Sequence, residues 1–81
     1  MDMIKLHILS PEGSLVQTTA EAVTLPGVVC PFMVLKDHAP LVTALVAGDI
    51  CWRTEGKEYS QPIREGFVEV RSNTVSCCVE V

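Results

Sequence analysis

Apolar residues occur along this chain in short runs, most of them bounded by Gly, Pro, Asp or Asn. The runs are broken about every 8–12 residues, a spacing typical of a β-sandwich or barrel. Near the start, Ile4, Leu6 and Ile8 alternate with Lys5 and His7. A period of two indicates a half-buried strand, because successive side chains of a strand point to opposite faces. No segment places apolar residues at helical spacing behind a capping residue. We therefore expect an all-β fold.

The run from Leu41 to Val46 is the one that could also be read as a helix. It is short, has three β-branched residues and lies between Pro40 and Gly48, so a strand is favoured. Two tight turns are predicted further along, a hairpin turn at Glu55-Gly56 and a second turn at Ser72-Asn73.

The last predicted strand separates two neighbouring cysteines. Alternation from Val75 to Val81 puts Cys77 on the face of the valines and Cys78 on the opposite face. We therefore expect Cys77 in the core and Cys78 on the outer face.

The stretch from Gly27 to Leu45 is apolar without regular alternation. We expect Val34, Leu35 and Leu45 in the core. Runs without alternation imply that both faces are covered. With no helix predicted in the chain, the second cover is expected to be a partner protein.

Composition excludes several functions. The length of 81 residues and mass of 8.8 kDa fit a single domain over residues 1–81. With 10 acidic and 6 basic residues the net charge is −4, and no basic stripe points to nucleic acid. The N-terminus lacks the features of a signal peptide. The longest nearly apolar stretch, Ala39 to Gly48, is about half of the ~20 residues that a membrane span needs. We expect a soluble chain with no direct membrane insertion.

Candidate chemistry is sparse. The cysteines show no C-x-x-C pair, so no metal site is predicted, and free thiols in a reducing cytosol are favoured over disulfides. His38 beside Asp37 could form a general acid–base pair, but no nucleophile is evident nearby. The glycines are isolated and form no phosphate-binding loop. We expect no catalytic residue and no cofactor.

One motif joins an aliphatic pair, two turn residues and a His-Ala-Pro-Leu block, and reads Val34-Leu35-Lys36-Asp37-His38-Ala39-Pro40-Leu41, followed by Thr43-Ala44-Leu45. Supporting motifs are Pro11-Glu12-Gly13, Gly66-Phe67-Val68-Glu69-Val70 and Asn73-Thr74-Val75. With these motifs the whole chain resembles the epsilon subunit of the F-type ATP synthase. The resemblance implies a β-sandwich or flattened barrel of about ten strands that carries no catalytic residue.

The resemblance also implies a role and partners. In this family the domain belongs to the central stalk, binds the gamma subunit and rests on the c-ring. It couples proton flow to ATP synthesis at the alpha and beta subunits, which it serves indirectly. Its expected location is peripheral, on the cytoplasmic face of the bacterial cell membrane.

Site residues follow from the same resemblance. The gamma-facing positions match Ser10, His38 and Thr43, beside the loop Ala39-Pro40-Leu41. The tip that faces the c-ring matches Val28, Val29, Cys30 and Pro31.

Three features depart from the family pattern. The tip is apolar where the family often has polar or small residues. The family usually has Gly at the position of Met33 and Pro-Gly at Lys36-Asp37, so a backbone conformation that requires glycine is not expected there. Typical members continue into two C-terminal helices, whereas this sequence stops at Val81, so either the subunit is naturally short or the chain has been cut.

The alternative function is a carrier domain of the lipoyl or biotinyl type. Such domains are also small acidic β-sandwiches, and they carry one modified lysine at a hairpin tip. Lys36 is the candidate, although its neighbours Leu35 and Asp37 do not match the usual context.

Overall fold

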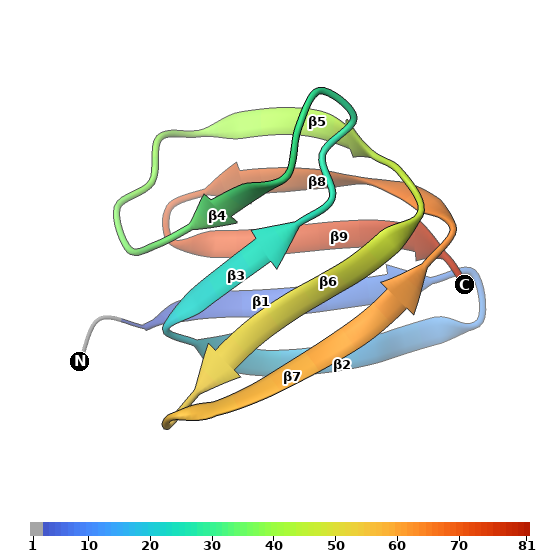
Figure 1. The fold of residues 1–81 in the computed structure, drawn as a ribbon. Helices are drawn as coiled ribbons and strands as arrows, with labels where there is room; N and C mark the ends of the chain where they lie inside the picture. Colours follow the sequence, from blue (N-terminus) through green and yellow to red (C-terminus); the bar gives the residue numbers. More distant parts are fainter. Residues whose placement is uncertain (1–2) are drawn as a thin grey trace.

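The structure is a computed structural model that describes residues 3–81, and it contains two packed β-sheets (Figure 1). The strands are β1 (Ile4–Ser10), β2 (Gly13–Ala20), β3 (Ala22–Leu25), β4 (Phe32–Val34), β5 (Leu41–Leu45), β6 (Gly48–Thr54), β7 (Lys57–Ile63), β8 (Glu65–Arg71) and β9 (Thr74–Glu80). The all-β prediction is confirmed, with nine strands within residues 3–81 where the resemblance implied about ten. None of the residues described forms a helix that could cross a membrane.

The two sheets differ in size, and the larger one contains both the first and the last of the described strands. One has the order β2-β1-β9-β8-β5, and the other has the order β4-β3-β6-β7. The first and last strands, β1 and β9, pair in parallel, while the other pairings are antiparallel. Among the described strands the chain passes between the sheets at four connections, β2–β3, β4–β5, β5–β6 and β7–β8, and the β4–β5 connection contains the His-Ala-Pro-Leu motif.

The core lies between the sheets and follows the predicted alternation. Ile4, Leu6 and Ile8 of β1 are buried, as are Val75, Cys77 and Val79 of β9. Cys78, by contrast, is exposed. The predicted placement of the two cysteines on opposite faces is therefore confirmed.

Both predicted tight turns are present, and each has two residues in the left-handed region. The φ angles are 53° and 77° at Glu55 and Gly56, and 51° and 60° at Ser72 and Asn73. Positive φ at both central residues is the signature of type I′ turns, whose twist matches that of hairpin strands. The strand prediction for Leu41 to Val46 is also confirmed by β5.

One core prediction is wrong. Val34 and Leu45 are buried, but Leu35 is 52% exposed. Strand β4 ends at Val34, and Leu35 begins the turn that carries the chain toward the other sheet. Because Leu35 directly follows the buried Val34, the period of two also points its side chain to the outer face, as it does for the exposed Met33.

Candidate functional site

The β4–β5 connection contains a tight turn at Leu35–His38. The amide of His38 donates to the carbonyl of Leu35 at 3.2 Å. Asp37, the third residue of this turn, has a φ of 65°. Position 37 therefore adopts a positive φ without glycine, which agrees with the expectation that glycine is not required here, because aspartate tolerates the left-handed conformation that Gly takes most easily.

Asn73 holds Asp37 in this conformation from the other side of the connection. The backbone amide of Asp37 donates to Asn73 Oδ1 at 2.6 Å, and Asn73 Nδ2 donates to Asp37 Oδ1 at 3.3 Å. We call this pair of hydrogen bonds the Asp37–Asn73 clasp. It joins the β4–β5 connection to the β8–β9 turn.

The clasp and the turn argue against the two rival functions. His38 Nδ1 lies 2.7 Å from the carbonyl oxygen of Ala39, while the Asp37 carboxylate accepts from Asn73, so these contacts do not assemble an acid–base pair. Lys36 lies between strands of different sheets rather than at the tip of a hairpin, which the carrier hypothesis requires. Over residues 3–81, no group of three or more His, Cys, Asp or Glu side chains is arranged to hold a metal ion.

Strand β5 divides the residues that the resemblance placed against gamma between two environments. Leu41 and Thr43 pair with the buried residues Val70 and Val68 and share their inward face. Leu41 is half-buried and packs against the core. Val42 points outward and is 71% exposed, so it is a better contact residue than Leu41. Ala39 and Pro40 are exposed in the connection.

Ser10 lies far from the His38 connection. Strands β9 and β8 separate β1 from β5, and Figure 1 shows the end of β1 and the β4–β5 connection at opposite ends of the sheet. The hydroxyl of Ser10 donates to the carbonyl of Gly13 at 3.2 Å and accepts from the amide of Glu12 at 3.3 Å. The structure therefore gives Ser10 a local role in the β1–β2 turn and does not bring it beside His38.

An apolar row crosses the outer face of the five-stranded sheet at the end where Ser10 lies, opposite the β4–β5 connection. The strand registers place its members next to one another in the order Leu9, Cys78, Phe67 and Ala44. Phe67 is 53% exposed, an unusual position for an aromatic side chain. Three members of the row, Leu9, Cys78 and Phe67, line an open depression of about 650 Å³, whose lining also includes Glu65 and Glu80.

The expectations drawn from the sequence did not include this row, although the alternation along β8 is a signal for it. Val68 and Val70 alternate inward along β8, which puts Phe67 outward by the same period of two. The partner of Cys78 in the row could not be deduced, because strand order was not known. Cys77 lies directly behind the same sheet, where burial raises the pKa of its thiol to about 12.

The tip between β3 and β4 is exposed and apolar, as the sequence predicted. Val29 is 90% exposed, and Val28, Cys30 and Pro31 are exposed as well. The base of the tip is fixed to β5, since the amide of Val28 donates to the carbonyl of Ala44 at 2.9 Å.

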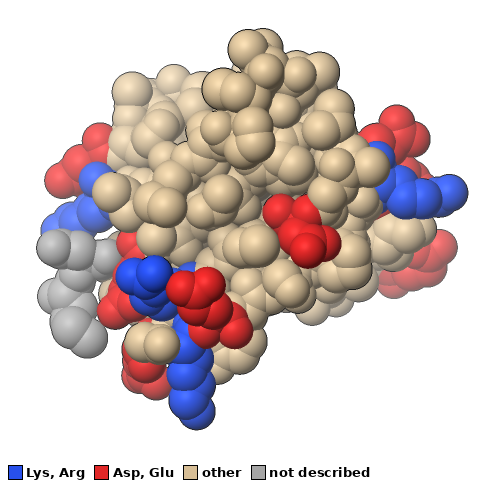
Figure 2. Space-filling model, in the orientation of Figure 1, with Lys and Arg blue, Asp and Glu red and all other residues tan. Residues whose placement is uncertain are grey.

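Few charged residues occur in the segment from Ala22 to Gly48, which contains the tip and β5. Between Ala22 and Gly48 the charged residues are Lys36 and Asp37 alone. Figure 2 shows the upper part of the molecule, where the tip and β5 lie, free of charged side chains on the visible face. The structure therefore brings the tip next to the end of β5 within one uncharged region.

Comparison with known proteins gives a consistent set of matches. A family described as "ATP synthase, Delta/Epsilon chain, beta-sandwich domain" matches residues 3–81. The ATP synthase epsilon chain of Dehalococcoides mccartyi is 37% identical over 75 residues, covering 93% of this chain and 54% of that protein. This chain therefore spans about half the length of that curated relative.

Two solved structures share the fold. A chain of the Euglena gracilis mitochondrial ATP synthase, solved with OSCP, F1 and the c-ring, superposes with a TM-score of 0.90 at 23% identity and covers 98% of this chain and 51% of its own length. A chain of the Tetrahymena thermophila mitochondrial ATP synthase, solved as central stalk and c-ring, gives 0.79 at 13% identity, with 95% and 63% covered.

Proposed function

Since this chain belongs to the family of ATP synthase delta/epsilon chain β-sandwich domains, we propose that it acts as a non-catalytic epsilon-type component of the central stalk. In this role it binds the gamma subunit, contacts the c-ring and helps couple proton flow to ATP synthesis. The alpha and beta subunits are indirect partners, and the location is peripheral, on the cytoplasmic face of the membrane. The family match over nearly the whole chain carries this proposal.

We assign the gamma contact to the outer face of the five-stranded sheet together with the β4–β5 connection. Ser10 and His38 lie at opposite ends of this sheet, so one partner can touch both only by covering the surface between them. That face carries the apolar row at the Ser10 end and, nearer its middle, the exposed Val42 beside Glu69. Burial of exposed apolar side chains is the main favourable term in protein association, and a few aromatic or aliphatic anchors usually dominate it.

The c-ring contact is assigned to the tip at Val28, Val29, Cys30 and Pro31. The tip is anchored to Ala44, the last member of the apolar row, so the two proposed surfaces meet at β5. The chain thus has room for gamma on the sheet face and for the c-ring on the tip. Because the tip is apolar, its contact with the ring is expected to depend on buried area more than on hydrogen bonds.

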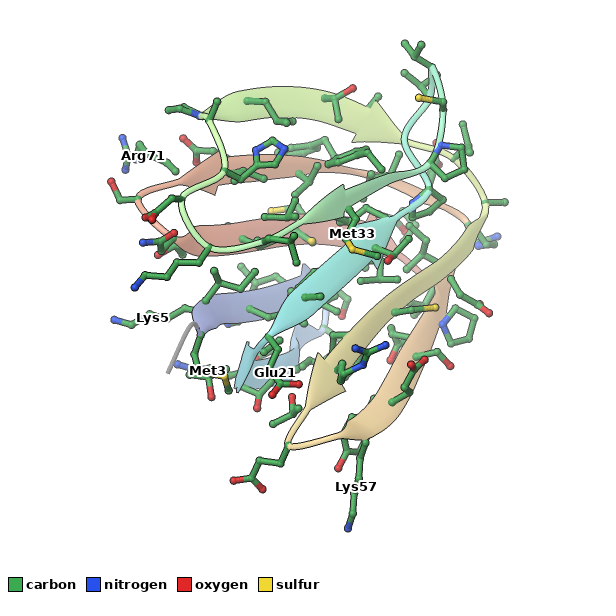
Figure 3. The ribbon with its side chains drawn as sticks, turned by 60° about the vertical axis from the view of Figure 1, so that its left-hand side comes forward. Met3, Lys5, Glu21, Met33, Lys57 and Arg71 are labelled. Carbon is green, nitrogen blue, oxygen red and sulfur yellow. The ribbon has the colours of Figure 1, made fainter. Side chains whose placement is uncertain are left out.

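Substitution of exposed side chains tests the gamma surface. We expect Phe67→Asp and Val42→Asp to weaken binding of the cognate gamma subunit more than tenfold, or about 1.4 kcal/mol, with the fold retained. Met33→Asp is the matched control, since Met33 is 55% exposed and pairs with Thr24 on the outward face of the other sheet (Figure 3). Calorimetric titration of gamma measures all three.

Two further variants help to interpret the affinities measured for Phe67→Asp and Val42→Asp. Ser10→Arg tests the far end of the surface and is expected to weaken gamma binding as well. Leu41→Asp reports on stability rather than on binding, because Leu41 packs against the core. Unchanged affinity in the folded Phe67→Asp and Val42→Asp variants would remove the sheet face from the gamma interface.

A further inference from the structure

The Asp37–Asn73 clasp links segments that are distant in sequence. Its two hydrogen bonds span 36 residues and join the β4–β5 connection to the β8–β9 turn. The carbonyl of Asn73 also accepts from the amide of Lys5 at 2.9 Å, at the start of β1. One residue therefore ties together three segments at the same end of the sandwich, where Figure 3 also shows Lys5 and Arg71.

The conformation of Asp37 explains why such a tie is needed. Its φ of 65° lies in the left-handed region, which is strained for any residue with a Cβ. Asn73 offsets this strain by accepting from the Asp37 amide and donating to its carboxylate, and a hydrogen bond to a charged acceptor is stronger than a neutral one. The clasp therefore adds to the turn's own hydrogen bond, in which the His38 amide donates to the Leu35 carbonyl.

We propose that Asn73 is a positioning residue for the gamma contact, acting through Asp37 to preset the connection that carries His38, Ala39 and Pro40. This inference rests on the proposed function for its partner. Pro40 fixes its own φ and restricts Ala39, so the clasp at one end and the proline at the other leave the connection few conformations. A loop already held in its bound conformation loses less conformational entropy when it docks. If only a fraction of the molecules hold that conformation, the apparent affinity for gamma falls in proportion to that fraction.

Two glycine variants distinguish the effect of losing the clasp hydrogen bonds from the effect of altering the turns that the clasp joins. Asn73→Gly removes the side-chain amide while keeping a residue that accepts positive φ in the β8–β9 turn. Asp37→Gly relieves the strain at position 37, so its turn no longer needs the clasp. The double variant tests whether Asn73→Gly still has an effect once Asp37→Gly has relieved the strain at position 37.

The first readout uses the chain alone. Hydrogen exchange of the His38 amide reports the turn directly, because this amide donates to the carbonyl of Leu35. We expect Asn73→Gly to raise the exchange rate about tenfold, and to change it less than about threefold in the Asp37→Gly background. An unchanged rate in Asn73→Gly would overturn the inference.

The second readout is affinity for the cognate gamma subunit, at a temperature where every variant is folded. Asn73→Gly is expected to weaken binding about tenfold, and Asp37→Gly with Asn73→Gly to restore it to within about threefold. An equal loss in both backgrounds would mean that Asn73 touches gamma directly, and it would overturn the positioning role. If exchange rises while gamma affinity stays constant, the positioning role also fails. In that case the Phe67→Asp result decides separately whether the proposed gamma surface stands.

Discussion

Cys77 and Cys78 show how sharply the environment changes between neighbouring residues in a thin sandwich. Cys77 is fully buried among the valines of the core, whereas Cys78 lies on the outer face beside Phe67. Burial disfavours the thiolate, which is why the pKa of Cys77 rises to about 12. Of these two thiols, the exposed Cys78 is therefore the one accessible to reagents.

Serine substitution at each position tests this difference. Cys77→Ser buries a hydroxyl without a partner, and we expect it to lower the free energy of unfolding by about 1–3 kcal/mol. Cys78→Ser changes a solvent-facing side chain and should stay within about 0.5 kcal/mol. Urea melts of both variants measure the effect. Equal or reversed losses would contradict the assignment of the two faces.

At the scale of elements, the pairing of β8 with β9 depends on a close backbone approach at Gly66. A Cβ at this position would contact the carbonyl oxygen of Cys78 and would lie 2.9 Å from Val79 Cα. Both are backbone atoms and cannot swing away as a flexible side chain would. The strand pair is therefore built around the absence of a side chain at this point.

Gly66→Ala should consequently destabilise the sandwich. We expect a loss of about 2–3 kcal/mol in the free energy of unfolding, since the two strands must move apart. Gly56→Ala is the control: a Cβ there meets open space, and the cost of about 1 kcal/mol comes from its positive φ. A Gly66→Ala variant as stable as Gly56→Ala in the same thermal melt would show that the strands adapt without cost.

Elements with a local signal could be predicted from the sequence, and those set by distant contacts could not. The alternation of β1 and β9 and the Glu55-Gly56 turn are local patterns, and all three appear in the structure. The left-handed Asp37 was missed because its support comes from Asn73, 36 residues away. The apolar row was missed for a similar reason, because its members come from four strands whose order is a property of the whole sheet.

At the scale of the molecule, the stability of the five-stranded sheet rests on its last strand. Strand β9 lies between β1 and β8, so it occupies the middle of that sheet. It also supplies Val75, Cys77 and Val79 to the core. Loss of β9 would remove this core layer and leave β1 and β8 each with one unpaired edge, because β1 would keep only β2 and β8 only β5.

A truncation that ends at Asn73 should therefore abolish cooperative unfolding. Its loss of buried apolar side chains exceeds what a marginally stable domain of this size can tolerate. Removal of Val81 alone is the control, since Val81 follows β9 and is exposed, and it should change stability by less than about 0.5 kcal/mol. Circular dichroism in increasing urea distinguishes the two. A cooperative transition in the shorter chain would show that β9 is dispensable.

The parallel pairing of β1 with β9 also has a consequence during synthesis. The ribosome releases β1 well before β9, yet the two are neighbours in the finished sheet. Until β9 emerges, β1 and β8 each present an open edge, and open edges pair readily with other chains. Strands β1 to β8 are therefore synthesised before this sheet can close. A chaperone that shields strand edges would act during that interval.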